Sequence, residues 1–133
     1  MAADAVLVFQ GEDVVLGQVE KTLVKLAPMQ PGRSYVVWAK GQLFSRNSHS
    51  TLRLEAFDDA KDSVEISFSD NQCLTSFALM VATTLPPDDD LFTVAKITGT
   101  SRPFVGGPET GTAIVKNATL VVLAVDSIRV QQG

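Results

Sequence analysis

The side chains that most often carry chemistry are scarce in this chain of 133 residues. His49 is the single histidine and Cys73 the single cysteine. A metal site with two or three imidazole ligands, a thiolate metal cluster and an internal disulfide are therefore all impossible within one chain. A Ser–His–Asp arrangement could use His49, but the nucleophile-elbow pattern G-x-S-x-G is absent. We interpret His49 as a solvated loop histidine, because its neighbours in "SRNSHS" are all polar, and Cys73 as a small buried apolar residue.

Acidic residues gather in two turn-like segments, Asp58–Asp62 and Asp88–Asp90. Oxygen-rich loops can hold calcium, but neither segment matches the EF-hand loop, so we favour solvated turns over a calcium site. "VGGPETG" lacks the lysine of a phosphate-binding loop. The pattern "NAT" at Asn117–Thr119 matches a glycosylation acceptor, but it opens an apolar strand and we treat it as a chance match. We therefore expect a protein without catalytic residues, metal or cofactor, and not an enzyme.

The composition and charge of the chain disfavour further functional classes of protein. The net charge is −4, the isoelectric point is about 4.8 and the basic residues are scattered singly, which disfavours binding to nucleic acid. No stretch approaches the roughly 20 apolar residues of a membrane helix, so no membrane insertion is expected. The first residues have no basic region and only a short apolar run, so we expect a soluble protein without a signal peptide. Export by another route, or release by cell lysis, stays open.

The elements that would position any site are strands. "SVEISFS" alternates Val64, Ile66 and Phe68 with polar residues, as a half-buried strand does. Turn clusters rich in Gly, Pro, Asn, Asp and Ser separate this run from others like it. We predict strands at 5–10, 13–16, 19–26, 34–44, 51–58, 63–69, 74–84, 91–98 and 112–125, with a split at Lys116–Asn117 left open.

Eight to nine short strands predict an all-β fold, an antiparallel β-sandwich. A jelly roll fits this count best. An immunoglobulin-like sandwich is the competitor, but its Cys…Trp…Cys arrangement is absent.

Two of the predicted strands are apolar on both faces. Tyr35–Trp38 and Leu120–Val125 contain no polar residue, whereas a strand with one wet face alternates. Their outer face must be covered either by the N-terminal segment or by another subunit. We favour a homo-oligomer, for example a trimer, with the N-terminal segment contributing. The candidate interface residues are Tyr35, Val36, Val37, Trp38, Leu120, Val121, Val122, Leu123, Ala124 and Val125, with no single face chosen.

Aromatic residues leave an alternative. Trp38, Tyr35 or Phe104 could stack on a sugar ring, which would make the protein a carbohydrate-binding adhesive module. Polar segments around Ser45–Ser50 and Ser101–Thr110 are expected to face outward as loops, where recognition is often found. A small hydrolase that uses His49 or paired Asp residues is the third and least favoured reading.

Four stretches carry a resemblance to a known kind of domain: "GRSYVVWAKGQLF", "TLRLEAFDDAKDSVEIS", "FALMVATTL" and "GTAIVKNATLVVLAVDSI". Together they resemble compact jelly rolls of the tumour-necrosis-factor-like kind, which also occur in bacterial surface proteins and in phage or phage-tail-like particles. The length of the chain predicts one domain over residues 1–133. The resemblance covers residues 32–128, the expected jelly-roll core, and residues 1–31 fall outside it as N-terminal strands or an arm. It also implies a non-enzymatic structural protein that decorates, caps or completes a virion or other particle beside other particle proteins.

Overall fold

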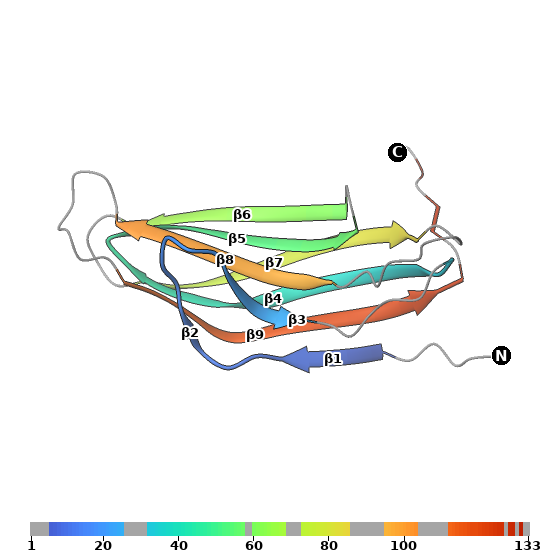
Figure 1. Ribbon diagram of the computed structural model, residues 1–133, viewed down its shortest axis with the longest axis horizontal. Coiled ribbons are helices and arrows are strands. Elements are labelled where there is room, and N and C mark those ends of the chain that lie inside the picture. Colours follow the sequence, from blue (N-terminus) through green and yellow to red (C-terminus); the bar gives the residue numbers. More distant parts are fainter. Residues whose placement is uncertain are drawn as a thin grey trace.

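A computed structural model describes residues 6–25, 32–57, 60–68, 73–85, 95–103, 112–126, 128–129 and 131. The elements assigned in these ranges are nine β-strands (Figure 1). Their bounds are β1 Val6–Gln10, β2 Val14–Val15, β3 Lys21–Lys25, β4 Ser34–Arg46, β5 Ser48–Phe57, β6 Ala60–Phe68, β7 Cys73–Thr84, β8 Lys96–Pro103 and β9 Thr112–Val125. The prediction of an all-β chain is confirmed.

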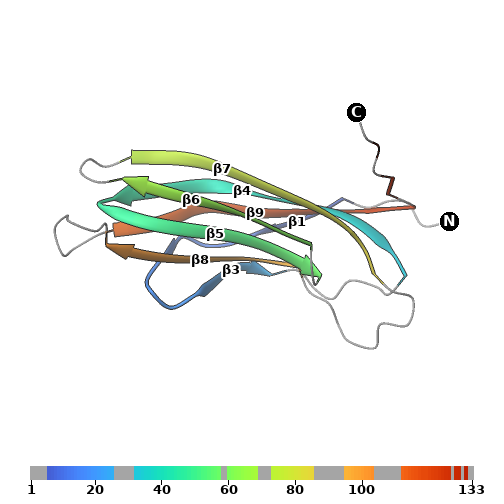
Figure 2. The same ribbon diagram turned by 90° about the horizontal axis from the view of Figure 1, so that it is seen from above.

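The strands form two antiparallel sheets that lie over one another as a sandwich (Figure 2). Sheet A has the order β1-β9-β4-β7, with β2 also paired to β9. Sheet B has the order β3-β8-β5-β6. Consecutive strands often change sheet, so neighbours in each sheet come from distant parts of the chain.

β1 and β2 act as one interrupted strand along β9. Between them, the backbone N–H of Gly11 donates to the carbonyl oxygen of Ala118 at 2.9 Å. Counted in this way, the first strand pairs with the last, the second with the seventh, the third with the sixth and the fourth with the fifth. This nesting of antiparallel pairs over two sheets is the jelly-roll arrangement that the sequence predicts.

The core lies between the two sheets and is built from the inward side chains of each strand. In β4, Val37, Ala39 and Leu43 are fully buried. Opposite them, sheet B contributes Leu52, Leu54 and Ile97. Because side chains alternate along a strand, the intervening residues of β4 must point away from the core.

A β-bulge interrupts the pairing of β4 with β9. Asn117 and Ala118 together lie opposite Gly41, and Asn117 has a φ of 56°. Asparagine tolerates this left-handed conformation better than most residues do. A Cβ at Gly41 would lie 2.8 Å from the Phe77 ring and 3.2 Å from Cα of Ala118, so the close packing at this position favours glycine. The open question of a split at Lys116–Asn117 is thus answered by a bulge within one strand.

Three details of the strand prediction are wrong. β5 begins at Ser48 rather than at residue 51, and β8 runs to Pro103 rather than ending at residue 98. Serines in both extensions point inward and form hydrogen bonds there, so these strand segments are buried although their sequence is polar. Residues 91–94, the predicted start of the same strand as β8, lie outside the described residues. The strand predicted at 19–26 begins at Lys21 and contains a bulge after Thr22, so that Leu23 and Val24 are both buried.

Candidate functional site

The outer face of sheet A carries a continuous apolar row across four strands. Val8 of β1 pairs with Val121 of β9, which pairs with Trp38 of β4, which pairs with Met80 of β7. Exposure is 56% for Val8, 37% for Trp38 and 54% for Met80. Leu123 and Val36 extend this row toward one end of the sheet and are half-buried.

A second apolar row crosses the same face near the opposite end of the strands. It joins Val15 of β2, Ile114 of β9, Phe44 of β4 and Leu74 of β7 through direct pairing. Val15 is 56% exposed and Leu74 is 54% exposed. Two rows of this kind on one face exceed the scattered single apolar residues that a protein surface normally shows.

A polar band separates the two rows. The amide of Asn117 donates to Oε1 of Gln42 at 3.2 Å, and the Lys116 ammonium lies 5.9 Å from the centre of the Phe44 ring. Lys40 stands in the same band, and Arg46 lies at the end of β4 on this face. Directly before β2, the exposed Asp13 adjoins the register position of Lys116. The outer face of sheet A therefore combines two apolar rows with a band whose charged strand residues, Lys40, Lys116 and Arg46, are basic.

Alternation divides the predicted interface residues into two sets of five. Tyr35, Val37, Leu120, Val122 and Ala124 point toward the core, where the first four are buried and Ala124 packs against the cluster. The remaining five lie on the outer face of sheet A: Val36, Trp38, Val121, Leu123 and Val125. Only this second set is available to a partner.

The sequence analysis did not single out Val8, Val15, Leu74 and Met80, although they complete the two rows. Their signal was present in "CLTSFALMVATT", where Leu74 and Met80 occupy the positions opposite Phe77, Leu79 and Val81. A helical spacing in the same segment obscured this alternation.

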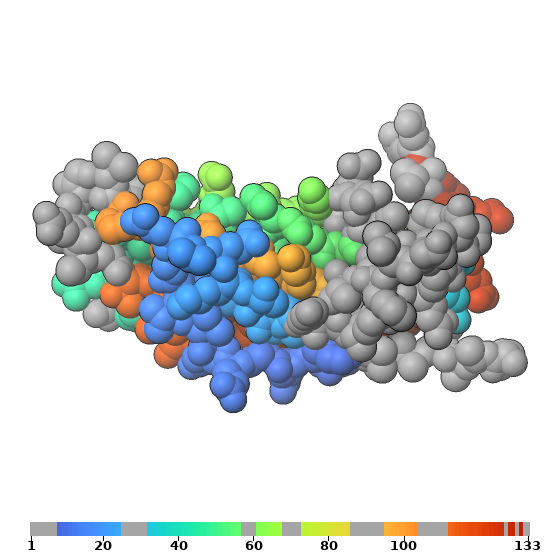
Figure 3. All heavy atoms as spheres, viewed as in Figure 1, coloured from blue at the N-terminus to red at the C-terminus, as the bar shows by residue number. Residues whose placement is uncertain are grey.

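The N-terminal segment lies beside β9 and not across the outer face of sheet A. Figure 3 shows β1 in dark blue along one long edge of the molecule, with β2 and β3 in lighter blue over the adjoining near surface. β1 pairs with β9 from Val6 to Gln10, and Val8 enlarges the apolar row instead of covering it. Within the described residues, the N-terminal segment therefore does not supply the expected cover.

The outer face of sheet B has a different character. It presents charged side chains of both signs, including Arg53 and Glu55, whose charged atoms lie 3.7 Å apart. His49 belongs to this face, on β5, with its side chain 26% exposed. The prediction of a loop histidine is wrong, because the inward serines on either side of His49 place it in a strand.

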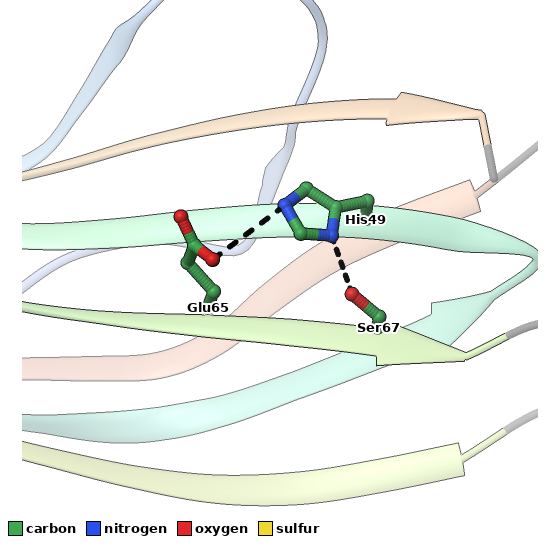
Figure 4. A network of polar contacts seen from close by, with 3 residues as sticks. All are labelled: His49, Glu65 and Ser67. Atoms are coloured by element: carbon green, nitrogen blue, oxygen red, sulfur yellow. Dashed lines mark hydrogen bonds and ion pairs between the residues drawn. The ribbon is translucent and has the colours of Figure 1, made fainter. Parts of the chain in front are cut away.

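His49 interacts with two residues of the neighbouring strand β6 (Figure 4). Its Nδ1 forms a hydrogen bond with Oγ of Ser67, and its Nε2 lies 4.0 Å from a carboxylate oxygen of Glu65. The order serine, histidine and carboxylate is that of a hydrolytic triad. Ser67 and Glu65 do not belong to the described lining of the pocket beside His49.

A pocket of about 290 Å³ opens on the other side of His49. It is bounded by β5, β8 and the connection between β2 and β3. The described residues that line it are all of polar types: Gln18, His49, Thr51, Thr100, Ser101 and Arg102.

The other candidates from the sequence contribute little. Cys73 is half-buried at the start of β7, with its sulfur 3.5 Å from Oγ1 of Thr75. Asp58, Asp59, Asp88–Asp90 and Phe104 lie outside the described residues. In the part of the chain that the structure describes, no three His, Cys, Asp or Glu side chains form a group that could hold a metal ion. The same ranges contain no helix long and apolar enough to cross a membrane.

No protein-family model matches the sequence, and no curated protein matches it. Two solved structures show a similar course of the chain. One is a chain from the T13 viral particle of IBDV, at 13% identity and a TM-score of 0.48; the other is from infectious bursal disease virus strain Gt, at 16% identity and a TM-score of 0.45. Each match covers 90% of this chain and 31% or 33% of the viral chain, so this chain spans about a third of their length. We draw no functional conclusion from likenesses this distant.

Proposed function

We propose that this protein is a non-enzymatic structural protein that self-associates and forms part of a larger particle, such as a virion or a phage-like assembly. The observation that carries the proposal is the pair of apolar rows on the outer face of sheet A. Contiguous exposed apolar surface of this kind is typical of protein interfaces, and tryptophan and methionine are enriched in their centres. The outer face of sheet B, which is polar and mixed in charge, suits contact with solvent.

The charges on the outer face of sheet A restrict how two copies meet. A two-fold contact of this face with itself would bring Lys40 and Lys116 of both copies into one interface. Like charges at a desolvated contact are unfavourable. The face therefore meets a different surface of the next copy, one that carries carboxylates. A head-to-tail contact forms a ring when the rotation between copies closes, as it would in the trimer that we propose, and an open filament when it does not.

The first test is the mass in solution, measured by light scattering, of the wild-type chain and of Trp38→Glu. We expect the wild type to form a discrete oligomer and Trp38→Glu to be a monomer at the same concentration, because a carboxylate in the apolar row cannot be buried there without a partner. Ser63→Glu is the matched control, since it adds the same charge on the outer face of sheet B, and it should keep the wild-type mass. Circular dichroism of all three proteins reports whether the fold is retained.

A wild-type chain that stays monomeric up to its solubility limit would contradict self-association. An oligomer that persists in folded Trp38→Glu would move the contact away from the outer face of sheet A.

A further inference from the structure

We propose that the polar pocket on the outer face of sheet B is a binding site for an acidic saccharide, that is, a sugar unit bearing a carboxylate. The pocket is the one lined by Gln18, His49, Thr51, Thr100, Ser101 and Arg102. This proposal goes beyond a structural role and does not depend on self-association.

The lining matches the two kinds of groups on such a ligand. Arg102 is exposed and always charged, and its planar guanidinium can donate two parallel hydrogen bonds to one carboxylate. Thr51 and Thr100 each offer a hydroxyl that donates and accepts, and Gln18 offers an amide that does both. Sugar hydroxyls need this mixture of donors and acceptors. Among the described lining residues Arg102 supplies the positive charge, and the Glu65 carboxylate lies beside the pocket, 4.0 Å from Nε2 of His49.

The strand register explains why these side chains converge. His49 is paired directly with Arg102, and Thr51 with Thr100, so the four side chains form two adjacent pairs on one face. The third wall comes from the connection between β2 and β3. There the N–H of Ser101 donates to the carbonyl of Gly17 at 2.8 Å, which holds the neighbouring Gln18 beside β8.

The site is also supported from beneath and from the side. Under the pocket, Oγ of Ser50 donates to Oγ of Ser101 at 3.0 Å inside the sandwich. On the side of β6, Ser67 holds the ring of His49 through its Nδ1 (Figure 4). Side chains held by a rigid sheet and by a second layer of contacts lose less freedom on binding a ligand. The contacts of His49 with Ser67 and Glu65 thus serve to position one wall of the pocket.

Size and location agree with a small ligand. Ligand pockets range from roughly 300 to 1,000 Å³, so about 290 Å³ suits a single sugar ring. The pocket opens on the outer face of sheet B, and the apolar rows lie on the outer face of sheet A. A contact between copies through sheet A would therefore leave the pocket open to solvent.

The test is a calorimetric titration of the full chain with the methyl glycosides of N-acetylneuraminic acid and of glucuronic acid. Methyl galactoside carries a sugar ring without a carboxylate, and acetate carries a carboxylate without a sugar ring. We expect saturable binding of at least one acidic glycoside. The neutral glycoside and acetate should each bind at least about tenfold more weakly than that acidic glycoside.

Variants assign the binding to the pocket. Arg102→Ala should weaken binding of the acidic glycoside about tenfold or more, because a charge-assisted hydrogen bond is lost. Arg102→Lys should fall between Arg102→Ala and the wild type, since it keeps the charge but not the fork. Lys96→Ala is the matched control, because it removes a cation from the same face of the same strand outside the pocket, and it should bind like the wild type.

Three outcomes would overturn the proposal. They are the absence of saturable binding by either acidic glycoside, equal affinity for acetate, and unchanged affinity in folded Arg102→Ala.

Discussion

Small polar residues inside the sandwich show how single atoms decide local stability. Ser45 is fully buried on β4, and its Oγ has no hydrogen-bond partner among the described residues. Ser50 is equally buried on β5, but its Oγ donates to Ser101. The two serines are alike in type and burial and differ only in whether the hydroxyl is satisfied, which makes them a natural pair for comparison.

We expect Ser45→Ala to raise the free energy of unfolding by about 1 kcal/mol, because it removes a hydroxyl that is buried without a partner. Ser50→Ala should lower that free energy by about 1–2 kcal/mol, since it leaves the hydroxyl of Ser101 without its donor. Urea denaturation of both variants checks the prediction. Changes of the same sign in the two proteins would contradict it.

The bulge between β4 and β9 shows how an element is shaped by its irregularities. Asn117 adopts the left-handed conformation in the middle of a long strand, and the extra residue shifts the register between Gln42 and Lys40. This shift keeps the alternation in phase at both ends of β9, so that Val115 and Leu120 both point into the core. Without it, one of the two apolar rows would face inward.

Asn117→Gly should change the free energy of unfolding by no more than about 0.5 kcal/mol, because glycine adopts a positive φ freely. Asn117→Val should lower it by about 1–2 kcal/mol, since the left-handed region is costly for a β-branched residue. Thermal unfolding of the two variants under the same conditions provides the comparison. A loss in Asn117→Gly as large as that in Asn117→Val would show that the side-chain contact of Asn117 with Gln42 matters more than its backbone.

Alternation of apolar and polar residues predicted most strands and the fold class, and the two-faced runs pointed to the outer face of sheet A. The missed ends of β5 and β8 have one physical cause. Ser48, Ser50 and Ser101 are buried and form hydrogen bonds with other polar groups inside the sandwich. A rule that places polar residues in turns therefore misassigns these strand segments. The pocket could not be predicted, because it depends on the pairing of His49 with Arg102, which lie far apart in the chain.

At the scale of the whole molecule, the two outer faces differ in kind. The face of sheet A offers apolar rows and positive charge, and the face of sheet B offers a polar pocket among charges of both signs. The free edge of β7 is partly closed by a carboxylate: Oδ2 of Asp62 on β6 accepts from the backbone N–H of Met80 at 3.1 Å. A charged residue at a strand edge discourages edge-to-edge pairing. This arrangement agrees with the self-association through the outer face of sheet A that we propose.

The nested pairing of the strands has a consequence for how the molecule opens and closes. The hairpin of β5 with β6 joins residues that are close in the sequence. The pairing of Val6 with Leu123 instead joins residues from nearly opposite ends of the chain. Because distant pairings carry the largest entropy of closure, β1 is expected to dock last during folding and to detach first. Native-state hydrogen exchange should find the amides between β1 and β9 opening at a lower free energy than those between β4 and β9. Equal opening energies would contradict this order. During such an opening, the bared edge of β9 is a place where the first strand of a second molecule can dock, so the fold carries a route to strand exchange between copies.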